Sequence, residues 1–333
     1  MEAAHIEATE STDEVALEAV ERCDLCGGRA FTPRRRWTDQ LLFGTRPWTL
    51  VECDGCSLCF LDPRPTPAAI GAFYPADYPA HTDRPVTPKR WHRRVAAEGA
   101  PPLRPWERPW IRMRQDVSWY RMPRWHGDGR VLDVGCGNGG RYLDILRALG
   151  WATHGVDPSP AAVERVRAKG HEALVGTADA HGFPAGSMDV VTLWHCLEHT
   201  HSPRRALETA FQTLRPGGLL SLGVPNYRSL QAALFRGCWS GAEVPRHLFH
   251  FSRRTLRRYL GETGFRVLSV TTRTGATSWP RAARHLVNTV FGTRWARDPG
   301  WLVELFEPLA HALSLVRYFG IGAELRIMAE RPA

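Results

Sequence analysis

The sequence predicts an α/β fold built on a doubly wound, largely parallel sheet, and two observations carry that prediction. From about residue 130 onwards, short apolar segments alternate with amphipathic ones, which is the pattern of strands and crossover helices. A glycine-rich turn, in the segment VLDVGCGNGG at 131–140, follows the first apolar segment. The expected strands are 130–134, 152–156, 172–175, 189–194, 219–224, 265–273 and 323–331. The expected helices of this part are 139–149, 160–169, 203–214 and 253–262.

The glycine turn lies where a strand passes into a helix, which is a site for a phosphate or a polar cofactor. Its glycines match the dinucleotide fingerprint, and Asp157 ends the next strand, where an acid holds ribose hydroxyls. Asp133 precedes the glycines, however, and a carboxylate there repels a pyrophosphate but suits a cation. Asp179 follows the third strand, where an adenine amino group can be held. The acids therefore favour a positively charged cofactor over a nicotinamide dinucleotide.

Four segments in order resemble the class I S-adenosylmethionine-dependent methyltransferases: VLDVGCGNGG, GVDPSP, DAHGFPAGSMDVVTLWHCLEH and LRPGGLL. The resemblance covers about residues 128–270 and implies a Rossmann-like sheet of seven strands with S-adenosyl-L-methionine as cofactor. The cofactor-binding residues that it implies are Asp133, Gly135, Gly137 and Gly139 at the methionine end, Asp157 at the ribose and Asp179 beside the adenine. The cofactor carries a sulfonium and an ammonium group but no phosphate, so the acidic positions agree with it.

Two C-x-x-C pairs, Cys23/Cys26 and Cys53/Cys56, lie near the N-terminus. Each pair offers two thiolates to one tetrahedral zinc ion, and four thiolates fill its coordination shell. We therefore predict a structural Zn²⁺ site in a zinc ribbon.

The remaining positions of this module are less typical of a ribbon. Gly27 permits the tight turn after the first pair, whereas Ser57 takes the equivalent place after the second. Cys59 is either a rival ligand or a small core residue. The dispersed cysteines, which we interpret as packing residues, are Cys136, Cys196 and Cys238.

The ribbon and the following segment, FLDPRPTPAAIGAFYPADY, resemble a bacterial subgroup in which a zinc ribbon precedes the methyltransferase domain. That subgroup includes deoxysugar C-methyltransferases and relatives in glycan and secondary-metabolite pathways. The predicted organisation is an acidic, frayed or loosely helical tail (1–20), the ribbon (21–62), a linker and basic Trp/Arg-rich lid (63–127), the methyltransferase core (128–281), a helical lid of two amphipathic helices (282–319) and the final strand (320–333). We interpret the basic stretch 84–130 and the 282–319 helices as a lid with its own small core. The alternative is a surface that binds a nucleotide-diphosphate sugar or a lipid-linked acceptor.

Transfer of a methyl group to a hydroxyl needs a group that removes the proton. The segment WHCLEHTHS follows the fourth strand, and one helical turn would bring His195, Glu198 and His199 together. This trio is a candidate base, a divalent metal site or a packed loop, and His199 is its base candidate. The segment EVPRHLFHFS follows the fifth strand, and its His247 matches a histidine of the sugar C-methyltransferases. Arg246 replaces their glutamate, so O-methylation with His247 or His199 as base is expected instead.

Composition sets the wider expectations. No apolar run reaches the roughly 18–20 residues of a membrane span. The acidic N-terminus is unlike a signal peptide, so a cytoplasmic protein is expected. The net charge of +9 fits an anionic partner or a simple bias toward arginine.

The expected function is methyl transfer to a small-molecule, sugar or lipid-linked acceptor, most readily at a hydroxyl. An RNA methyltransferase that uses the ribbon and the basic stretch is one alternative. A non-catalytic scaffold that binds the cofactor is another. Peripheral membrane contact and the oligomeric state stay open.

Overall fold

The computed structural model describes residues 15–41, 44–74, 87–117, 122–137, 141–274, 278–293, 295, 300–301, 304–306, 308 and 320–333. The chain divides into two compact units, each treated by itself below. The first comprises Met1–Pro75, Pro225–Leu256 and Thr272–Leu325, and the second comprises Ala76–Val224, Arg257–Thr271 and Arg326–Ala333.

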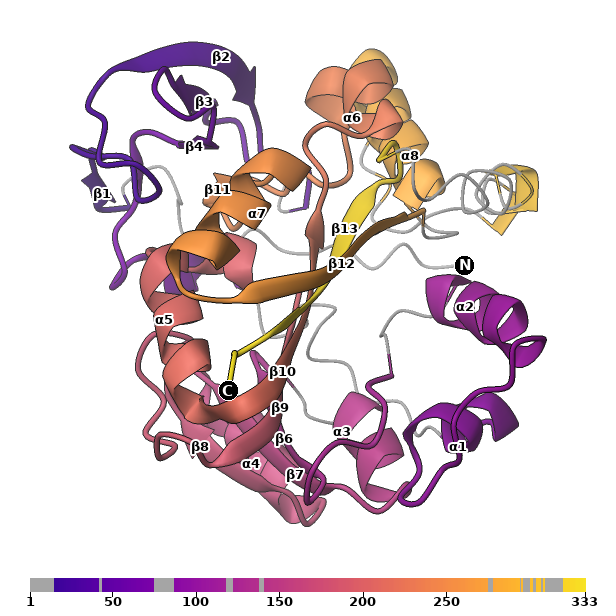
Figure 1. Ribbon diagram of the computed structural model, residues 1–333. Coiled ribbons are helices and arrows are strands. Elements are labelled where there is room, and N and C mark those ends of the chain that lie inside the picture. Colours follow the sequence, from indigo (N-terminus) through magenta and orange to yellow (C-terminus); the bar gives the residue numbers. More distant parts are fainter. Residues whose placement is uncertain are drawn as a thin grey trace. The chain divides into compact units, whose positions relative to one another are not determined.

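The second unit is built on a seven-stranded sheet with the order β12-β13-β10-β9-β6-β7-β8 (Figure 1). The strands are β6 (Arg130–Val134), β7 (Ala152–Asp157), β8 (Glu172–Val175), β9 (Met188–Trp194), β10 (Leu214–Pro225), β12 (Arg266–Arg273) and β13 (Glu324–Glu330). The pairs β6–β7, β7–β8, β6–β9 and β9–β10 are parallel. All seven predicted strands are present, and the predicted doubly wound fold is confirmed.

The strand order reverses at β6, which pairs with β7 on one side and β9 on the other. Ligands of such sheets bind at the carboxyl ends of the strands next to this reversal. The last strand differs from its neighbours in direction. Backbone hydrogen bonds join Gly217 and Gly218 to Arg331, and Asn226 to Ala323, so β13 runs antiparallel to β10.

Local sequence explains the strands and helices of this unit. Every residue of β9 is buried, as expected of a central parallel strand. The side chains of Ser159 and Ser202 accept hydrogen bonds from the backbone N–H groups of Ala162 and Arg205, and a proline follows each serine. The helices are α3 (Arg141–Arg147), α4 (Pro160–Ala168), α5 (Pro203–Thr213) and α7 (Arg253–Glu262).

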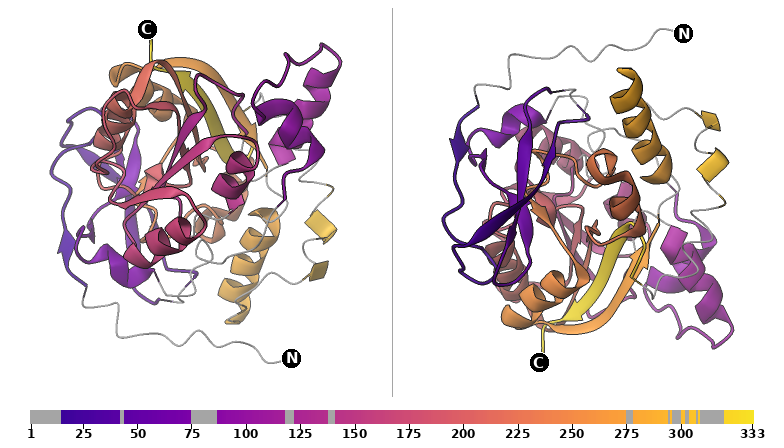
Figure 2. Two further views of the ribbon diagram at one scale, coloured as in Figure 1. Left: turned by 90° about the horizontal axis from the view of Figure 1, so that it is seen from below. Right: turned by 90° about the horizontal axis from the view of Figure 1, so that it is seen from above.

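The basic stretch before β6 forms two short helices, α1 (Arg90–Ala96) and α2 (Glu107–Val117), which lie side by side (Figures 1 and 2). The prediction that this stretch has its own small core is wrong. Its buried Trp91 and Ile111 belong to the same apolar cluster as Leu146 and Trp151 of the sheet domain. The Trp151 indole also donates to the Ala96 carbonyl (2.6 Å).

The first unit contains a four-stranded sheet with the order β11-β4-β3-β2. Its strands are β2 (Phe31–Trp37), β3 (Trp48–Cys53), β4 (Cys59–Leu61) and β11 (Phe249–His250). Three come from the cysteine module, but β11 comes from the segment after β10, and Phe249 pairs with Phe60. The helical elements of the unit whose bounds the structure describes are η2 (Ile70–Phe73), α6 (Leu230–Phe235), η5 (Arg236–Cys238) and α8 (Ser278–Phe291).

The N-terminal segment differs from the predicted loose tail where the structure describes it. A short strand, β1 (Leu17–Glu18), pairs antiparallel with β5 (Arg64–Pro65). Residues 1–14 lie outside the described part of the chain. Of the two helices predicted over 282–319, α8 is present and begins earlier, whereas 309–319 is likewise outside it. Among the helices that are described, none has the length and apolar character needed to cross a membrane.

Candidate functional site

The turn after β6 has a backbone that glycine adopts without strain. Gly135 and Gly137 have φ angles of +73° and +56°, a region that L side chains rarely enter. Space is also short at Gly135, where an added Cβ would lie 2.9 Å from the Cys196 Sγ. The turn at the end of β6 therefore needs glycine at both positions for its backbone angles, and at Gly135 also for the packing of Cys196. Gly139 lies outside the described residues.

Asp133 places a buried carboxyl group just before this turn. Its Oδ1 accepts a hydrogen bond of 2.6 Å from the Thr192 hydroxyl. Burial and the charge of Asp157 raise the pKa of Asp133 to about 7, against the opposing effect of the Thr192 bond. Within the described part of the chain, no cationic side chain forms an ion pair with Asp133. A cationic ligand would therefore stabilise its ionised form.

Asp157 ends β7 and is also buried. Its Oδ2 accepts a hydrogen bond from the backbone N–H of Gly137 (2.8 Å), and its Oδ1 accepts one from Ser159 (2.9 Å). The carboxylate thus joins the tip of β7 to the glycine turn and to the start of α4. Carboxylate oxygens have further lone pairs, so this group is also able to accept hydrogen bonds from ligand hydroxyls.

These groups fit S-adenosyl-L-methionine better than they fit a dinucleotide. The buried carboxyl group of Asp133, just before the turn, would repel the phosphates of a dinucleotide, whereas it attracts a sulfonium or ammonium group. Asp157 suits the ribose hydroxyls of either cofactor. The structure therefore brings Asp133, Gly135, Gly137 and Asp157 together, as predicted for a cofactor site.

Asp179 lies in a tight turn after β8. Its Oδ1 accepts a hydrogen bond from the Thr177 hydroxyl (2.7 Å), and its backbone carbonyl accepts one from Thr209 (3.1 Å). The N–H of Gly176, at the start of the turn, donates to the Asp157 carbonyl (3.1 Å). The turn is thereby held next to the end of β7, which is where the resemblance puts the adenine.

The loop after β9 packs against the glycine turn through Cys196, whose Sγ occupies the space above Gly135. His195 has a φ angle of +51°, and its N–H donates to the Gly223 carbonyl (2.9 Å). Its Nδ1 lies 3.3 Å from Oε1 of the fully buried Glu198. The helical turn predicted here is a short 3₁₀ turn, η4 (Leu197–His199). It brings His195 and Glu198 together, and His199 is half-buried at its end.

His247 belongs to the first unit and is buried. Its Nδ1 lies 2.9 Å from the carbonyl oxygen of Gly241. A carbonyl only accepts hydrogen bonds, so Nδ1 carries the proton in the neutral ring and Nε2 is the basic atom. Nε2 is also 3.8 Å from Oε2 of Glu243.

Arg246, next to His247, is a structural residue. Its guanidinium group is fully buried and donates two hydrogen bonds of 2.8 Å to the two oxygens of Asp39. It also donates to the Phe73 carbonyl (3.3 Å). Sequence reasoning missed Asp39 because the two partners are 207 positions apart. The arginine that departs from the sugar C-methyltransferase pattern therefore holds the first unit together.

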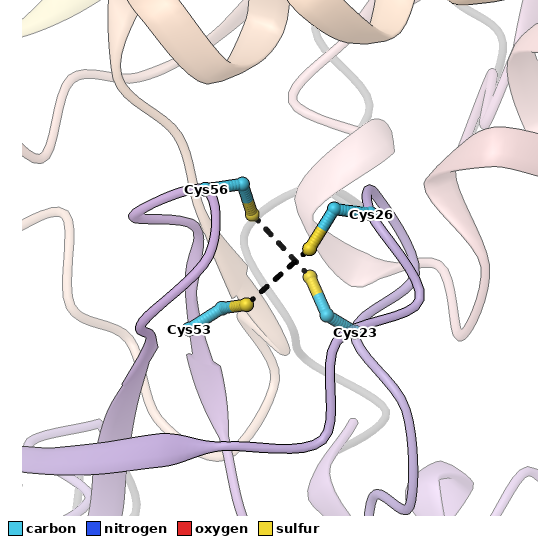
Figure 3. A group of neighbouring side chains, drawn as sticks. All are labelled: Cys23, Cys26, Cys53 and Cys56. Carbon is cyan, nitrogen blue, oxygen red and sulfur yellow. Dashed lines mark hydrogen bonds between the residues drawn. The ribbon is translucent and has the colours of Figure 1, made fainter.

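The four cysteines of the two C-x-x-C pairs point their sulfur atoms at one another (Figure 3). All four Sγ atoms lie within 4.8 Å of each other, and the Cys23–Cys56 and Cys26–Cys53 contacts are 3.5 Å. Four convergent thiols at this spacing fit a tetrahedral metal site. Burial raises the pKa of Cys56 to about 11, so a bound cation would be needed to hold it as a thiolate.

The remaining cysteines are separate from this cluster. Cys59 is buried, and its thiol contacts Oε2 of Glu52 (3.5 Å), so it is a core residue rather than a rival ligand. Cys136 packs against Gly155, where an added Cβ would lie 2.8 Å from its sulfur. Cys196 packs on the glycine turn, and Cys238 donates to the Thr289 hydroxyl (3.5 Å). Their predicted packing role is confirmed.

The two cysteine turns have the same geometry although their sequences differ. Gly27 has a φ of +73° and Ser57 a φ of +63°, and each donates its N–H to the carbonyl of the first cysteine of its pair (2.8 Å). We expect Ser57→Gly to stabilise the chain by about 0.5–1 kcal/mol, because the left-handed conformation is unfavourable for serine. Urea denaturation of the metal-loaded protein measures this.

The matched control is Gly27→Ser, where an added Cβ meets no atom within 4 Å. Only backbone strain then changes, and a loss of about 0.5–1 kcal/mol is expected. Equal stability of both variants and the parent would contradict the strain argument.

Comparison with known proteins adds a family and several relatives. Residues 92–270, just over half of the chain, match a protein family described as "Methyltransferase domain". The Ubiquinone biosynthesis O-methyltransferase of Xanthomonas oryzae pv. oryzae (strain PXO99A) is 35% identical over 104 residues, which are 29% of this chain and 43% of that protein. The 27-O-demethylrifamycin SV methyltransferase of Amycolatopsis mediterranei (strain S699) is 34% identical over 123 residues, 33% of this chain and 45% of that protein.

The chain thus spans less than half the length of these two relatives. Among solved structures, it is similar to an S-adenosylmethionine-dependent methyltransferase of Thermotoga maritima that is described as a possible histamine N-methyltransferase. The identity is 21% and the TM-score 0.43, with 68% of this chain and 94% of that chain covered.

Proposed function

Because the chain belongs to the methyltransferase-domain family over residues 92–270, we propose that it transfers the methyl group of S-adenosyl-L-methionine to a hydroxyl group of a small molecule. The observation that carries this proposal is the pair of buried carboxyl groups at the glycine turn. Asp133 and Asp157 are both less than 10% exposed, and the charge of Asp157 contributes to the raised pKa of Asp133. A cofactor with a cationic methionine end and ribose hydroxyls would suit Asp133 and Asp157, respectively.

The proposed acceptor is a small molecule, for example a sugar, rather than RNA. Both relatives are named for small molecules, and their names favour oxygen as the atom that is methylated. A role in glycan or secondary-metabolite biosynthesis would agree with the resemblance of the N-terminal module. These relatives match only about a third of the chain, so the acceptor is part of the proposal.

In this proposal the chain's own residues bind the cofactor and remove a proton. The bound cofactor supplies an electrophilic methyl group. Asp157 would accept hydrogen bonds from ribose hydroxyls, Asp179 would lie beside the adenine, and Asp133 would face the methionine end. A neutral hydroxyl is a weak nucleophile, so a histidine must accept its proton. His247 is our first choice because its Nε2 is the basic atom, and His199 is the second.

The cofactor site is tested by the substitution Asp157→Ala. Loss of the carboxylate is expected to weaken S-adenosylmethionine binding by about 1–3 kcal/mol, the contribution of hydrogen bonds to a charged group. Calorimetric titration measures the affinity, and thermal unfolding shows whether the variant is folded. Asp128→Ala, at an exposed position, is the matched control and should bind as the parent does. Unchanged affinity in folded Asp157→Ala protein would refute the assignment.

We also propose a structural zinc ion at Cys23, Cys26, Cys53 and Cys56. Cys26→Ser is expected to lower the zinc content from one ion per chain to well below half an ion, because serine is a poor zinc ligand. Atomic emission spectroscopy of purified protein gives the ratio. Cys59→Ser is the matched control, since Cys59 lies outside the cluster. Equal zinc content in the two variants would overturn this site.

A further inference from the structure

Four rings of the first unit, those of Trp37, Tyr227, Trp239 and His250, form one cluster. Every ring centroid lies 5.3–6.5 Å from the other three. The rings come from separated parts of the chain: Trp37 ends β2, Tyr227 follows β10, Trp239 follows η5 and His250 belongs to β11. We call this group the four-ring cluster. Trp37, Trp239 and His250 are at most 3% exposed, while Tyr227 is partly open to solvent.

The buried nitrogen atoms of the four-ring cluster lack hydrogen-bond partners among the residues that the structure describes. These atoms are the indole N–H groups of Trp37 and Trp239 and both ring nitrogens of His250. The buried side-chain amide nitrogen of Gln231 also lacks a partner among these residues. The Oε1 atom of Gln231 accepts a hydrogen bond from Ser240, the residue after Trp239. Buried polar groups without partners are rare in proteins because they cost stability. Such a concentration in one place is what a ligand-binding site leaves unpaired in the free chain.

The orphaned atoms specify the chemistry of that ligand. Burial, and the neighbouring His247, hold the pKa of His250 well below its usual range, so the ring is neutral. A neutral imidazole has one donor and one acceptor. The indoles and the amide add donors only, and none of the orphaned atoms belongs to a charged side chain. The cluster therefore offers several donors and few acceptors to an uncharged ligand.

We propose that the four-ring cluster binds an uncharged ring that carries oxygen acceptors, such as a phenol or a ring ketone. Flat aromatic faces bind such a ring, and the N–H groups would donate to its oxygen atoms. A sugar fits less well, because its several hydroxyl groups bring several protons to donate, whereas the orphaned atoms include one acceptor, a ring nitrogen of His250, which a single phenol can satisfy. The inference rests on the proposed function, in which this ring would be part of the methyl acceptor.

A pocket of the same unit is lined by residues near the two tryptophans in the chain or in contact with the segment before Trp239. Thr38 follows Trp37 in the chain, and Thr289 accepts a hydrogen bond from Cys238, which precedes Trp239. Both threonines line an open pocket of about 310 Å³. The other lining residues are polar or small: Asp39, Gln40, Gly44, Asn288, Gly292 and Thr293.

The test uses the full chain and 4-hydroxyacetophenone, an uncharged ring with a phenol and a ketone, as probe. Calorimetry should show saturable binding of this probe, and methyl α-D-glucopyranoside should bind more weakly. His250→Phe keeps the ring but removes both nitrogen atoms. We expect it to weaken probe binding about two- to tenfold, the loss of one hydrogen bond. Trp37→Phe should weaken binding by a similar factor.

Thermal unfolding of the same proteins without probe separates a ligand site from a structural histidine. If the His250 nitrogens have no partners in the free protein, His250→Phe should raise the melting temperature, by about 2–4 °C. A histidine with structural hydrogen bonds, to water or protein, would instead give a lower melting temperature. No probe binding by the parent, unchanged affinity in His250→Phe, stronger glucoside binding or a lowered melting temperature would each overturn the inference.

Binding of S-adenosylmethionine, measured on the same samples, keeps this test distinct from that of the proposed function. Intact cofactor binding without probe binding would reject the four-ring cluster alone. Absent cofactor binding by the parent would reject the proposed function itself.

Discussion

His247→Asn is expected to lower the turnover of methyl transfer by about 10²–10⁴-fold, the usual contribution of a general base. Asparagine can still donate an N–H to the Gly241 carbonyl, which now accepts from Nδ1 at 2.9 Å. What is lost is the basic Nε2 atom. The measurement is transfer of labelled methyl from S-adenosylmethionine to an acceptor identified with the parent enzyme, under saturating cofactor.

The matched variant is His199→Asn, at the other candidate base. We expect it to retain turnover within about tenfold of the parent, and both variants to bind the cofactor normally. The opposite ranking, with His199→Asn inactive and His247→Asn active, would move the base to the loop after β9. Parental turnover in both variants would remove histidine from the proton transfer.

Arg246→Met is expected to destabilise the chain by about 3–5 kcal/mol, the usual effect of breaking a buried ion pair. The substitution removes both 2.8 Å hydrogen bonds to Asp39 and leaves that carboxylate in a buried place without them. Urea denaturation of zinc-loaded protein gives the free energy of unfolding. Asp39→Asn in the same chain should recover part of the loss, because it neutralises the uncompensated charge.

An exposed ion pair provides the comparison. Arg204 pairs with Glu262 at the surface, and Arg204→Met should cost no more than about 1 kcal/mol. If Arg246→Met cost as little as Arg204→Met, the buried pair would not hold the first unit together.

The sheet of the second unit could be predicted because local signals agree with tertiary structure there. The apolar run of β9 reads as a buried parallel strand, and all seven of its residues are buried. Ser159 and Ser202, each followed by proline, mark the start of α4 and α5 in the sequence and cap those helices in the structure. Regular alternation and caps depend on near neighbours, so sequence alone reveals them.

The parts that could not be predicted depend on contacts between distant residues. The strand β11 has two residues, and its pairing of His250 with Cys59 has no periodic signal. The strand β1 is equally short and exists because Leu17 pairs with Pro65. The packing of Trp91 into the core of the sheet domain depends on residues more than 50 positions away. The spacing of residue types along the sequence does not reveal these distant contacts.

In the candidate site, too, some features could be predicted from the sequence and others could not. Spacing was enough to group the four cysteines, and the strand ends were enough to place Asp133 and Asp157 at one turn. The partners that set their surroundings were not predictable: Thr192 on Asp133, Cys196 on Gly135 and Asp39 on Arg246. These partners influence the charge state of the buried groups and the rigidity of the backbone around them. The site depends on both properties, and neither can be predicted from local sequence.

Methyl transfer itself is the central claim, and one labelling measurement tests it most directly. The purified chain is incubated with S-adenosylmethionine labelled in its methyl group and with fractions of a bacterial extract, and labelled species are identified by mass. The account predicts label on a hydroxyl oxygen of a small molecule, and less label with Asp157→Ala at a cofactor concentration that does not saturate the variant. Label confined to RNA, or bound cofactor with no label transferred to any fraction, would contradict it.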